Sequence, residues 1–186
     1  MAITSLPHRD HTEGTDNMGG IQQTAYYAVR SEFATMYLPY SLTEASSMAQ
    51  LGTIKQQHVF NAGKGWKRLY NTEDTGSVEA KQQGETDGMS FVNTMTGFFP
   101  GISAADAGWF RYMNNTGVVG IGLDAEGLKR QVGNEQYPGH LVDLNVTTTV
   151  TGAGRKGSAY AIKAQCPYPA PFYPYTIEEE DESNSD

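Results

Sequence analysis

The stretch L-V-D-L-N-V-T-T-T-V, residues 141–150, alternates apolar and polar side chains. Its apolar positions are Val142, Leu144, Val146 and Val150. A period of two residues is typical of a strand with one buried face. The glycine-rich turn T-G-A-G-R-K-G follows, and residues 159–166 alternate again on the way back. Residues 141–165 are therefore predicted to form one long antiparallel hairpin whose apolar stripe faces a core.

The composition of the 186-residue chain favours a β-protein made of short strands. Glycine is frequent, at 21 residues, and only 38% of the residues are hydrophobic, as expected where many turns join strands over a thin core. The length suits one domain, which we place at residues 20–166. No apolar run approaches the roughly 20 residues that span a bilayer, and residues 1–11 lack the apolar stretch of a signal peptide. We therefore expect a soluble protein with no membrane partner.

Both ends of the chain are predicted to form arms outside this domain. Residues 1–19 show neither a helical nor a strand period and are expected to be flexible. Residues 167–177 contain four prolines and four aromatic residues, a composition that favours an extended, polyproline-like strap. The strap either packs on its own domain or crosses to a neighbouring subunit.

Negative charge is concentrated in residues 178–186. This tail holds six acids and no base, so the formal net charge of −8 divides into −6 for the tail and −2 for the rest. A run of like charges repels itself and buries no apolar surface, so the tail is predicted to be disordered unless a basic partner binds it. The rest of the chain has no basic stripe, which argues against tight binding to nucleic-acid phosphates.

Further strands and hairpins are predicted between the arms. The strands are expected at residues 21–29, 53–60, 66–70, 77–83, 89–98, 118–123 and 128–132. Three pairs of them flank glycine-containing turns and are expected to form hairpins. The turns are A-G-K-G after residues 53–60, G-E-T-D-G after residues 77–83 and D-A-E-G after residues 118–123.

One helix is predicted among the strands. Ser103 is its expected N-cap, and Ala105, Trp109 and Met113 recur every four residues on one face. Asparagine and glycine at residues 114–117 should end it. A second, shorter helix within residues 41–51 is left open, with Ser41 as its N-cap and Glu44 three residues on. The residues just before it, including Met36, Tyr37, Leu38 and Tyr40, predict an exposed hydrophobic loop.

Possible chemical motifs in the chain have simpler explanations. Residues 152–157 match G-x-G-x-x-G, but a strand pattern follows them, so no helix N-terminus is available for a pyrophosphate. His8 and His11 lack a third strong metal ligand at diagnostic spacing. Cys166 is interpreted as a small buried hydrophobe, and His58 is expected to make ordinary hydrogen bonds. We therefore expect no enzyme, no cofactor and no metal.

The predicted elements follow one another as a strand, a long loop, paired strands, one helix and a closing hairpin. This order resembles that of the tail tube proteins of tailed bacteriophages. The resemblance spans roughly residues 20–166 and is carried by G-V-V-G-I-G-L-D-A-E-G-L-K-R-Q-V-G-N-E-Q-Y-P-G-H-L-V-D-L-N-V-T-T-T-V-T-G-A-G-R-K-G-S-A-Y-A-I-K-A, which begins at Gly117; it is strongest from Val118 to Ala164. It is a similarity of pattern without an invariant motif. Tail terminators, distal tail proteins and the inner tubes of contractile injection machines share this pattern, and the acidic tail and the strap are not general in the family.

The resemblance implies a fold and a function. The fold is mainly β, an antiparallel β-sandwich or barrel with one flanking α-helix and extended N- and C-terminal arms. The function is that of a virion structural protein, a tail tube subunit that forms stacked hexameric rings and so builds the channel for genome delivery. Its partners would be copies of itself, the tape-measure protein and DNA in the channel, and other tail proteins at the tube ends.

Two sets of residues follow as candidates for assembly. The polar positions of the closing hairpin are candidates to face the lumen: Asp143, Asn145, Thr147 and Thr149. Lys163 on the return strand would then need a partner, which Asp143 can supply. The exposed loop and the strap are candidates for inter-subunit contacts: Met36, Tyr37, Leu38, Tyr40, Phe172, Tyr173 and Tyr175. The rival hypothesis is a glycan- or protein-binding β-sandwich module, for which the aromatic residues would be suited.

Overall fold

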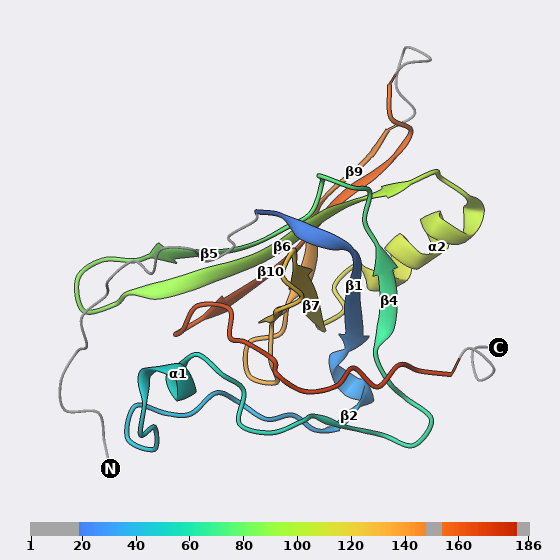
Figure 1. The fold of residues 1–186 in the computed structure, drawn as a ribbon. Helices are drawn as coiled ribbons and strands as arrows, with labels where there is room; N and C mark the ends of the chain where they lie inside the picture. Colours follow the sequence, from blue (N-terminus) through green and yellow to red (C-terminus); the bar gives the residue numbers. More distant parts are fainter. Residues whose placement is uncertain (1–18, 148–153, 182–186) are drawn as a thin grey trace.

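Two four-stranded antiparallel sheets form the body of the protein in the computed structural model, which describes residues 19–147 and 154–181 (Figure 1). The first sheet contains β1 (Ile21–Val29), β4 (Lys67–Tyr70), β7 (Val118–Asp124) and β8 (Lys129–Val132), in the order β4-β1-β7-β8. The second contains β5 (Ser77–Gln83), β6 (Ser90–Pro100), β9 (His140–Thr147) and β10 (Gly157–Cys166), in the order β5-β6-β10-β9. The expected mainly-β fold is confirmed.

Smaller elements complete the described chain. A two-stranded sheet joins β2 (Phe33–Thr35) to β3 (Val59–Phe60), a 3-10 turn η1 (Arg30–Glu32) precedes β2, and α1 (Met48–Leu51) is a single turn. The longest helix is α2 (Ala104–Met113). In Figure 1, α2 lies beside β4, and the hairpin of β9 and β10 projects away from the body.

The main core lies between the two sheets. Met95 and Ile162 of the second sheet are buried against Val118 of the first. On β7 the positions that face this core include Gly120 and Gly122. A Cβ atom at Gly120 would lie 2.8 Å from Cε of Met95, well inside van der Waals contact. The missing side chains therefore let the sheets approach closely.

A second core lies on the opposite face of the first sheet. Val119 and Ile121 of β7 are buried there beneath Trp66 and Tyr173, each of which is 1% exposed. We call residues 33–66 together with residues 170–177 the covering layer. Because both faces of β7 are buried over most of its length, residues 118–123, V-V-G-I-G-L, contain no polar side chain, and the only polar residue of the strand is Asp124 at its end.

The helix α2 confirms the prediction made from Ser103. The Ser103 N–H donates to Oδ2 of Asp106 at 2.7 Å, and the Asp106 N–H donates to Oγ of Ser103 at 3.1 Å, which is a reciprocal capping box. Asn115 follows the helix at φ +64°. Trp109 donates from Nε1 to the Tyr27 hydroxyl at 2.8 Å, so α2 is fixed to β1.

Two of the three predicted hairpins are confirmed and one is wrong. β5 pairs with β6 and β7 pairs with β8. β3 and β4, however, do not pair with each other: β3 pairs with β2, and β4 pairs with β1. Phe60 stacks on Phe33 with ring centroids 4.4 Å apart, which holds β3 in the covering layer while β4 extends the first sheet.

The short helix also begins later than Ser41. Ser47 caps α1, whereas Ser41 and Glu44 form a separate turn in which the Ser41 N–H donates to Oε2 of Glu44 at 3.1 Å. Hydrogen bonds from Lys55 and Ser41 lower the pKa of the Glu44 carboxyl to about 2. The predicted cap contact exists, but it closes a turn instead of starting a helix.

Candidate functional site

One face of the second sheet is left uncovered by the described residues. Side chains from all four of its strands line a broad concavity of about 720 Å³. They include Glu79, Lys81, Thr94, Thr96, Asp143, Ala161 and Lys163. We call this surface the open face. Thr94 and Thr96 come from β6, whose other side carries the core residue Met95, so the period-two alternation places their hydroxyls outward.

Charge on the open face is balanced. Glu79 and Lys81 lie two residues apart on β5 and therefore on one side of it. Asp143 forms an ion pair with Lys163 across β9 and β10. The pairing expected for Lys163 is thus confirmed, and the face holds two acids against two bases among the residues that line the concavity.

Three of the four candidate lumen residues lie on this face. Asn145 is directly opposite Ala159 and Thr147 opposite Gly157, and residues paired in this way point to the same side of a sheet. Ala159 lines the concavity together with Asp143. Thr149 lies outside the described residues.

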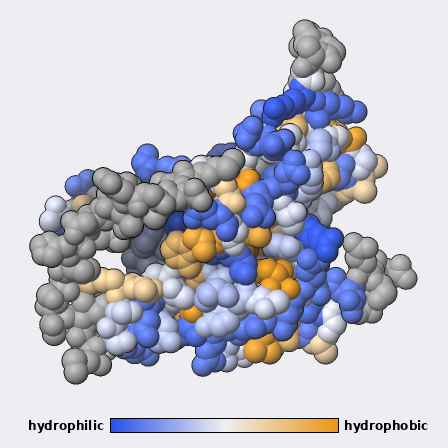
Figure 2. All heavy atoms as spheres, viewed as in Figure 1, coloured by the Kyte–Doolittle hydropathy of each residue, from blue (hydrophilic) through white to orange (hydrophobic). Residues whose placement is uncertain are grey.

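The core-facing stripe expected at Val142, Leu144 and Val146 is wrong, since the residue of β9 that packs against the core is Leu141; Val150 lies outside the described residues. Asp143 adopts φ +54° and the register shifts between Ala159 and Ala161, which is a β-bulge. The bulge puts Val142 opposite Ala161 on the open face. Beyond it the hairpin projects past the body, as Figure 1 shows, and Leu144 and Val146 are 37% and 47% exposed. Figure 2 shows hydrophilic and hydrophobic residues side by side along this hairpin.

The hydrophobic loop expected to be exposed is instead packed within the same chain. Met36 is part of the second core, between the covering layer and the first sheet, with Tyr37 packed against that core. The Tyr37 N–H donates to Nδ1 of His58 at 3.2 Å. Leu38 and Tyr40 are half-buried, and the carbonyl of Leu38 accepts from the Lys55 N–H at 3.3 Å. Residues 53–60 supply the cover that was expected from a second subunit.

The strap also packs on its own domain, which excludes Tyr173 as a contact to another subunit in this conformation. The Phe172 N–H donates to the Gly52 carbonyl at 2.7 Å, and the Tyr173 N–H donates to the Lys129 carbonyl at 2.9 Å. Tyr175 donates its hydroxyl to the Lys55 carbonyl at 2.5 Å. Phe172 remains 38% exposed, with the Arg130 guanidinium 4.8 Å from its ring centre.

The acidic tail is not disordered where it is described. Glu179 and Glu180 form ion pairs with the chain's own Arg68, Lys64 and Lys67. The prediction of a solvated tail is therefore wrong for residues 178–180, because the chain itself supplies the basic partner: three bases within residues 64–68, far from the tail in the sequence, lie beside the start of β4. Residues 182–186 and the N-terminal residues 1–18 lie outside the described residues.

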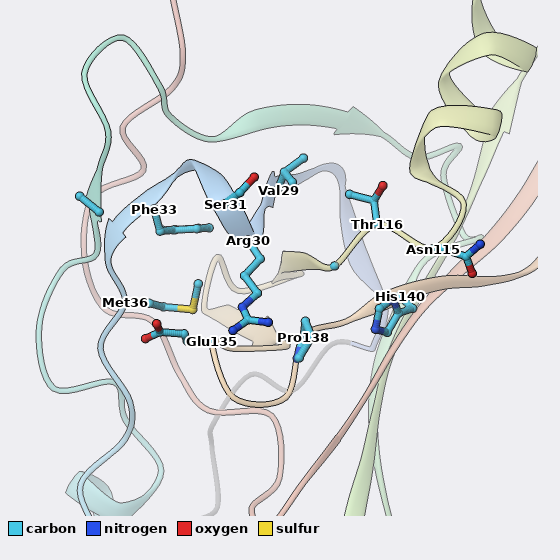
Figure 3. Close-up of a pocket in the computed structure, with 12 residues that line it drawn as sticks. Val29, Arg30, Ser31, Phe33, Met36, Asn115, Thr116, Glu135, Pro138 and His140 are labelled. Carbon is cyan, nitrogen blue, oxygen red and sulfur yellow. The ribbon is translucent and has the colours of Figure 1, made fainter.

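A second cavity was not anticipated from the sequence. It measures about 620 Å³. It lies between the end of β1, strand β2, the loop before β7 and the loop after β8. In Figure 3 the Arg30 side chain extends into it, with Glu135, Pro138 and His140 around the guanidinium. These residues come from segments about 100 positions apart, so no local pattern could have indicated them. A guanidinium and a carboxylate in one open cavity can hold a polar ligand.

A third cavity lies beneath α2 and is mostly apolar. It measures about 340 Å³ and is lined by Tyr27, Leu69, Phe99, Trp109 and Phe110, with Arg68 and Asp106 as its charged residues. It follows from the incomplete contact of α2 with the sheets, since Ala105 is exposed.

The single cysteine of the chain lies in the core. Cys166 is buried, and burial raises the pKa of its thiol to about 11, so the thiolate is scarce at neutral pH. Its expected place in the core is confirmed. Residues 19–147 and 154–181 contain no group of three or more histidine, cysteine or acidic side chains arranged to hold a metal ion. In the same residues no helix is long and apolar enough to cross a membrane.

Comparisons with known proteins found no match to a protein family, to a curated protein or to a solved structure.

Proposed function

We propose that this chain is a tail tube subunit of a tailed bacteriophage, with the open face of the second sheet lining the channel. The role is structural and not catalytic, and its place is the virion tail. The observation that carries the proposal is the contrast between a first sheet covered on both faces and a second sheet with one polar, charge-balanced face left open.

The chemistry of the open face suits a channel for DNA. Threonine hydroxyls at Thr94 and Thr96 hydrate well, and the paired charges of Asp143 and Lys163 leave little net field. A positively charged wall would hold phosphates through counterion release and electrostatic attraction, whereas passage requires weak contact. The polar, balanced face fits a surface along which a polyanion slides.

The edges of the second sheet support assembly into a ring. Its outer strands are β5 and β9, and within the described residues neither has a partner on its outer side. An unpaired edge is a template for another strand, and ring closure removes every such edge. Strand β9 of one subunit next to β5 of the following one would continue the open face around a lumen.

Electron microscopy of the purified protein tests the assembly. Tubes of stacked rings are the expected result. Single rings that do not stack would favour a tail terminator or a distal tail protein of the same fold group, and a monomer at all concentrations would count against the proposal.

A lysine variant tests which surface faces the lumen. Thr94→Lys combined with Thr147→Lys should give tubes that retain short duplex DNA and protect it from nuclease. The matched control is Tyr112→Lys on α2, where the side chain is 73% exposed and lies off the open face. Intact double-variant tubes whose DNA is fully digested would place the open face outside the channel.

A ligand-binding module is the second candidate function, and the cavity at Arg30 is the observation that favours it. A monomer that binds a polar ligand, with binding lost in Arg30→Ala and kept in Thr94→Ala, would support this alternative.

A further inference from the structure

The described C-terminal residues extend the edge of the first sheet. The Trp66 N–H donates to the Glu178 carbonyl at 2.8 Å, and the Glu180 N–H donates to the Trp66 carbonyl at 3.0 Å. This is a parallel bridge between Trp66 and Glu179, placed just before β4. Figure 1 shows the last described residues, in red, beside the start of β4.

Three bases receive the acidic side chains, and we call Lys64, Lys67 and Arg68 the basic strip. Glu180 lies 3.0 Å from Nζ of Lys64 and 2.6 Å from Nζ of Lys67, and its side chain is only 7% exposed. Burial opposes ionisation of Glu180, but its bonds to Lys67 and Lys64 outweigh burial and lower its pKa. Glu179 lies 2.5 Å from Arg68.

Glycine at position 65 allows the acidic segment to approach. A Cβ atom there would lie 2.6 Å from the Glu180 nitrogen and 2.8 Å from the Glu178 carbonyl oxygen. Real Cβ atoms do not come this close to backbone atoms that cannot give way. The absence of a side chain at Gly65 is therefore a specific requirement of this contact, independent of the charges around it.

The acidic segment is anchored differently from the strap that precedes it. Ala170 and Tyr173 are buried in the protein, whereas Glu178 and Glu179 are exposed and held by polar contacts. Exposed ion pairs contribute little individually and weaken as salt rises. The segment, including the less exposed Glu180 with its two lysine partners, is held mainly by polar contacts, so it can leave the basic strip without uncovering the buried residues of the strap.

We propose that the basic strip with Gly65 is a recognition site for an acidic, extended peptide segment. Residues 178–181 fill it in the isolated chain, and the same segment of a second copy can fill it in an assembly. Main-chain bonds to Trp66 select an extended backbone, and the strip selects carboxylates. The inference holds whether or not the chain forms tubes.

Binding of the segment in trans is the direct test. A variant that ends at Tyr175 keeps residues 167–175 of the strap and empties the site. A fluorescent peptide with the sequence of residues 176–181, T-I-E-E-E-D, should bind this variant and should bind the full-length chain at least about 10-fold more weakly, because the tethered segment competes at high effective concentration. Its affinity should fall as sodium chloride is raised.

Two controls separate a built site from general attraction between charges. Gly65→Ala in the shortened variant keeps every charge and should weaken binding of the peptide by about 10-fold or more. A peptide of the same composition in the order E-T-E-I-D-E should bind more weakly than the native order. Equal binding of both peptides, or no effect of Gly65→Ala in a variant whose circular dichroism matches that of its parent, would overturn the proposal. So would the absence of peptide binding to the shortened variant.

A mixing experiment distinguishes the two sources of the segment. The shortened variant offers a site without a segment, and full-length Lys64→Glu/Lys67→Glu offers a segment without a site. Native mass spectrometry should show a one-to-one complex of these two chains, and the complex should be lost when Gly65→Ala is added to the shortened partner. If the peptide binds but this complex does not form, the site binds only the segment of its own chain, and the proposed exchange of segments between copies is wrong.

Discussion

The two sheets of the sandwich differ in the number of faces that the chain covers. β7 in the first sheet has Val118 toward one core and Val119 toward the other, and both are buried. β6 in the second sheet has Met95 inward and Thr94 toward the open face. A continuous apolar run thus marks a strand between two layers, and alternation marks a strand with one layer. The comparison locates the surface that remains available for assembly.

Removing the centre of the covering layer should have the largest effect on stability. Trp66→Ala is expected to lower the free energy of unfolding by about 3–5 kcal/mol, since the ring is buried against Phe33, Phe60 and Tyr173. Urea denaturation measures this loss in the free energy of unfolding. Thr94→Ala on the open face is the control and should change stability by less than about 0.5 kcal/mol. Similar costs for the two variants would remove the distinction between the two sheets.

Adding a side chain at Gly122, where β7 lies close to the second sheet, should have the next largest effect on stability. A Cβ atom at Gly122 would fall inside van der Waals contact with Cγ2 of Val78 on β5, so Gly122→Ala should cost about 1–3 kcal/mol. Adding Val78→Ala should recover part of that loss in a double-mutant cycle. Gly108→Ala on α2, where no atom lies within 4 Å, should instead stabilise by roughly 0.5–1 kcal/mol. Destabilisation at Gly108 equal to that at Gly122 would contradict the steric explanation.

Acid should loosen the covering layer before it affects the open face. His58 is 2% exposed, and its Nδ1 accepts from the Tyr37 N–H while Nε2 lies 2.9 Å from Oε1 of Gln131. Burial lowers the pKa of His58, so the folded state resists protonation. Its contribution to stability is complete above the unfolded value of about 6.5 and is lost as pH falls below it, by up to about 1.4 kcal/mol per pH unit.

Unfolding midpoints between pH 7.5 and pH 5 measure this effect. His58→Gln should flatten the pH dependence, and the exposed His140→Gln should leave it unchanged. The reverse order of effects would assign the dependence to another group.

The smallest effect is expected at the bulge on the open face. Asp143→Asn removes the charge pair with Lys163 but keeps a residue that tolerates φ +54°, so it should cost less than about 1 kcal/mol and less still at high salt. Asp143→Ala should cost roughly 1 kcal/mol more, because alanine is strained in the left-handed region. Equal values for the two variants would show that backbone conformation is not a factor here.

Local patterns predicted the elements whose partners are near in sequence. Strand β1 was expected at residues 21–29, the observed bounds, and the turns that join β5 to β6 and β7 to β8 both carried glycine between predicted strands. The capping box at Ser103 is equally local. Among the candidate lumen residues, Asp143 was also paired correctly with Lys163, because cross-strand pairing follows from the hairpin itself.

The covering layer could not be predicted in this way. Met36 and Tyr37 were read as exposed because their cover, His58 and Tyr173, lies 21 to 137 residues away. The bulge at Asp143 places Val142 on the open face. The alternating sequence pattern of β9 does not predict where such a bulge inserts an extra residue. The ion pairs of the acidic segment were not predicted for the same reason, since Lys64 and Arg68 precede Glu180 and Glu179 by over 110 residues.

The strap has a consequence for the order of events during synthesis. It joins β8 to the segment before β3, since the Gln131 N–H donates to the Pro171 carbonyl while the Ile54 N–H donates to that of Phe172. The ribosome makes residues 170–175 after every described strand, at roughly 5–20 residues per second. Trp66 and its neighbours therefore stay incompletely covered until the strap emerges. A nascent chain stalled before residue 170 should expose this aromatic cluster to a hydrophobic dye, whereas the released chain should not.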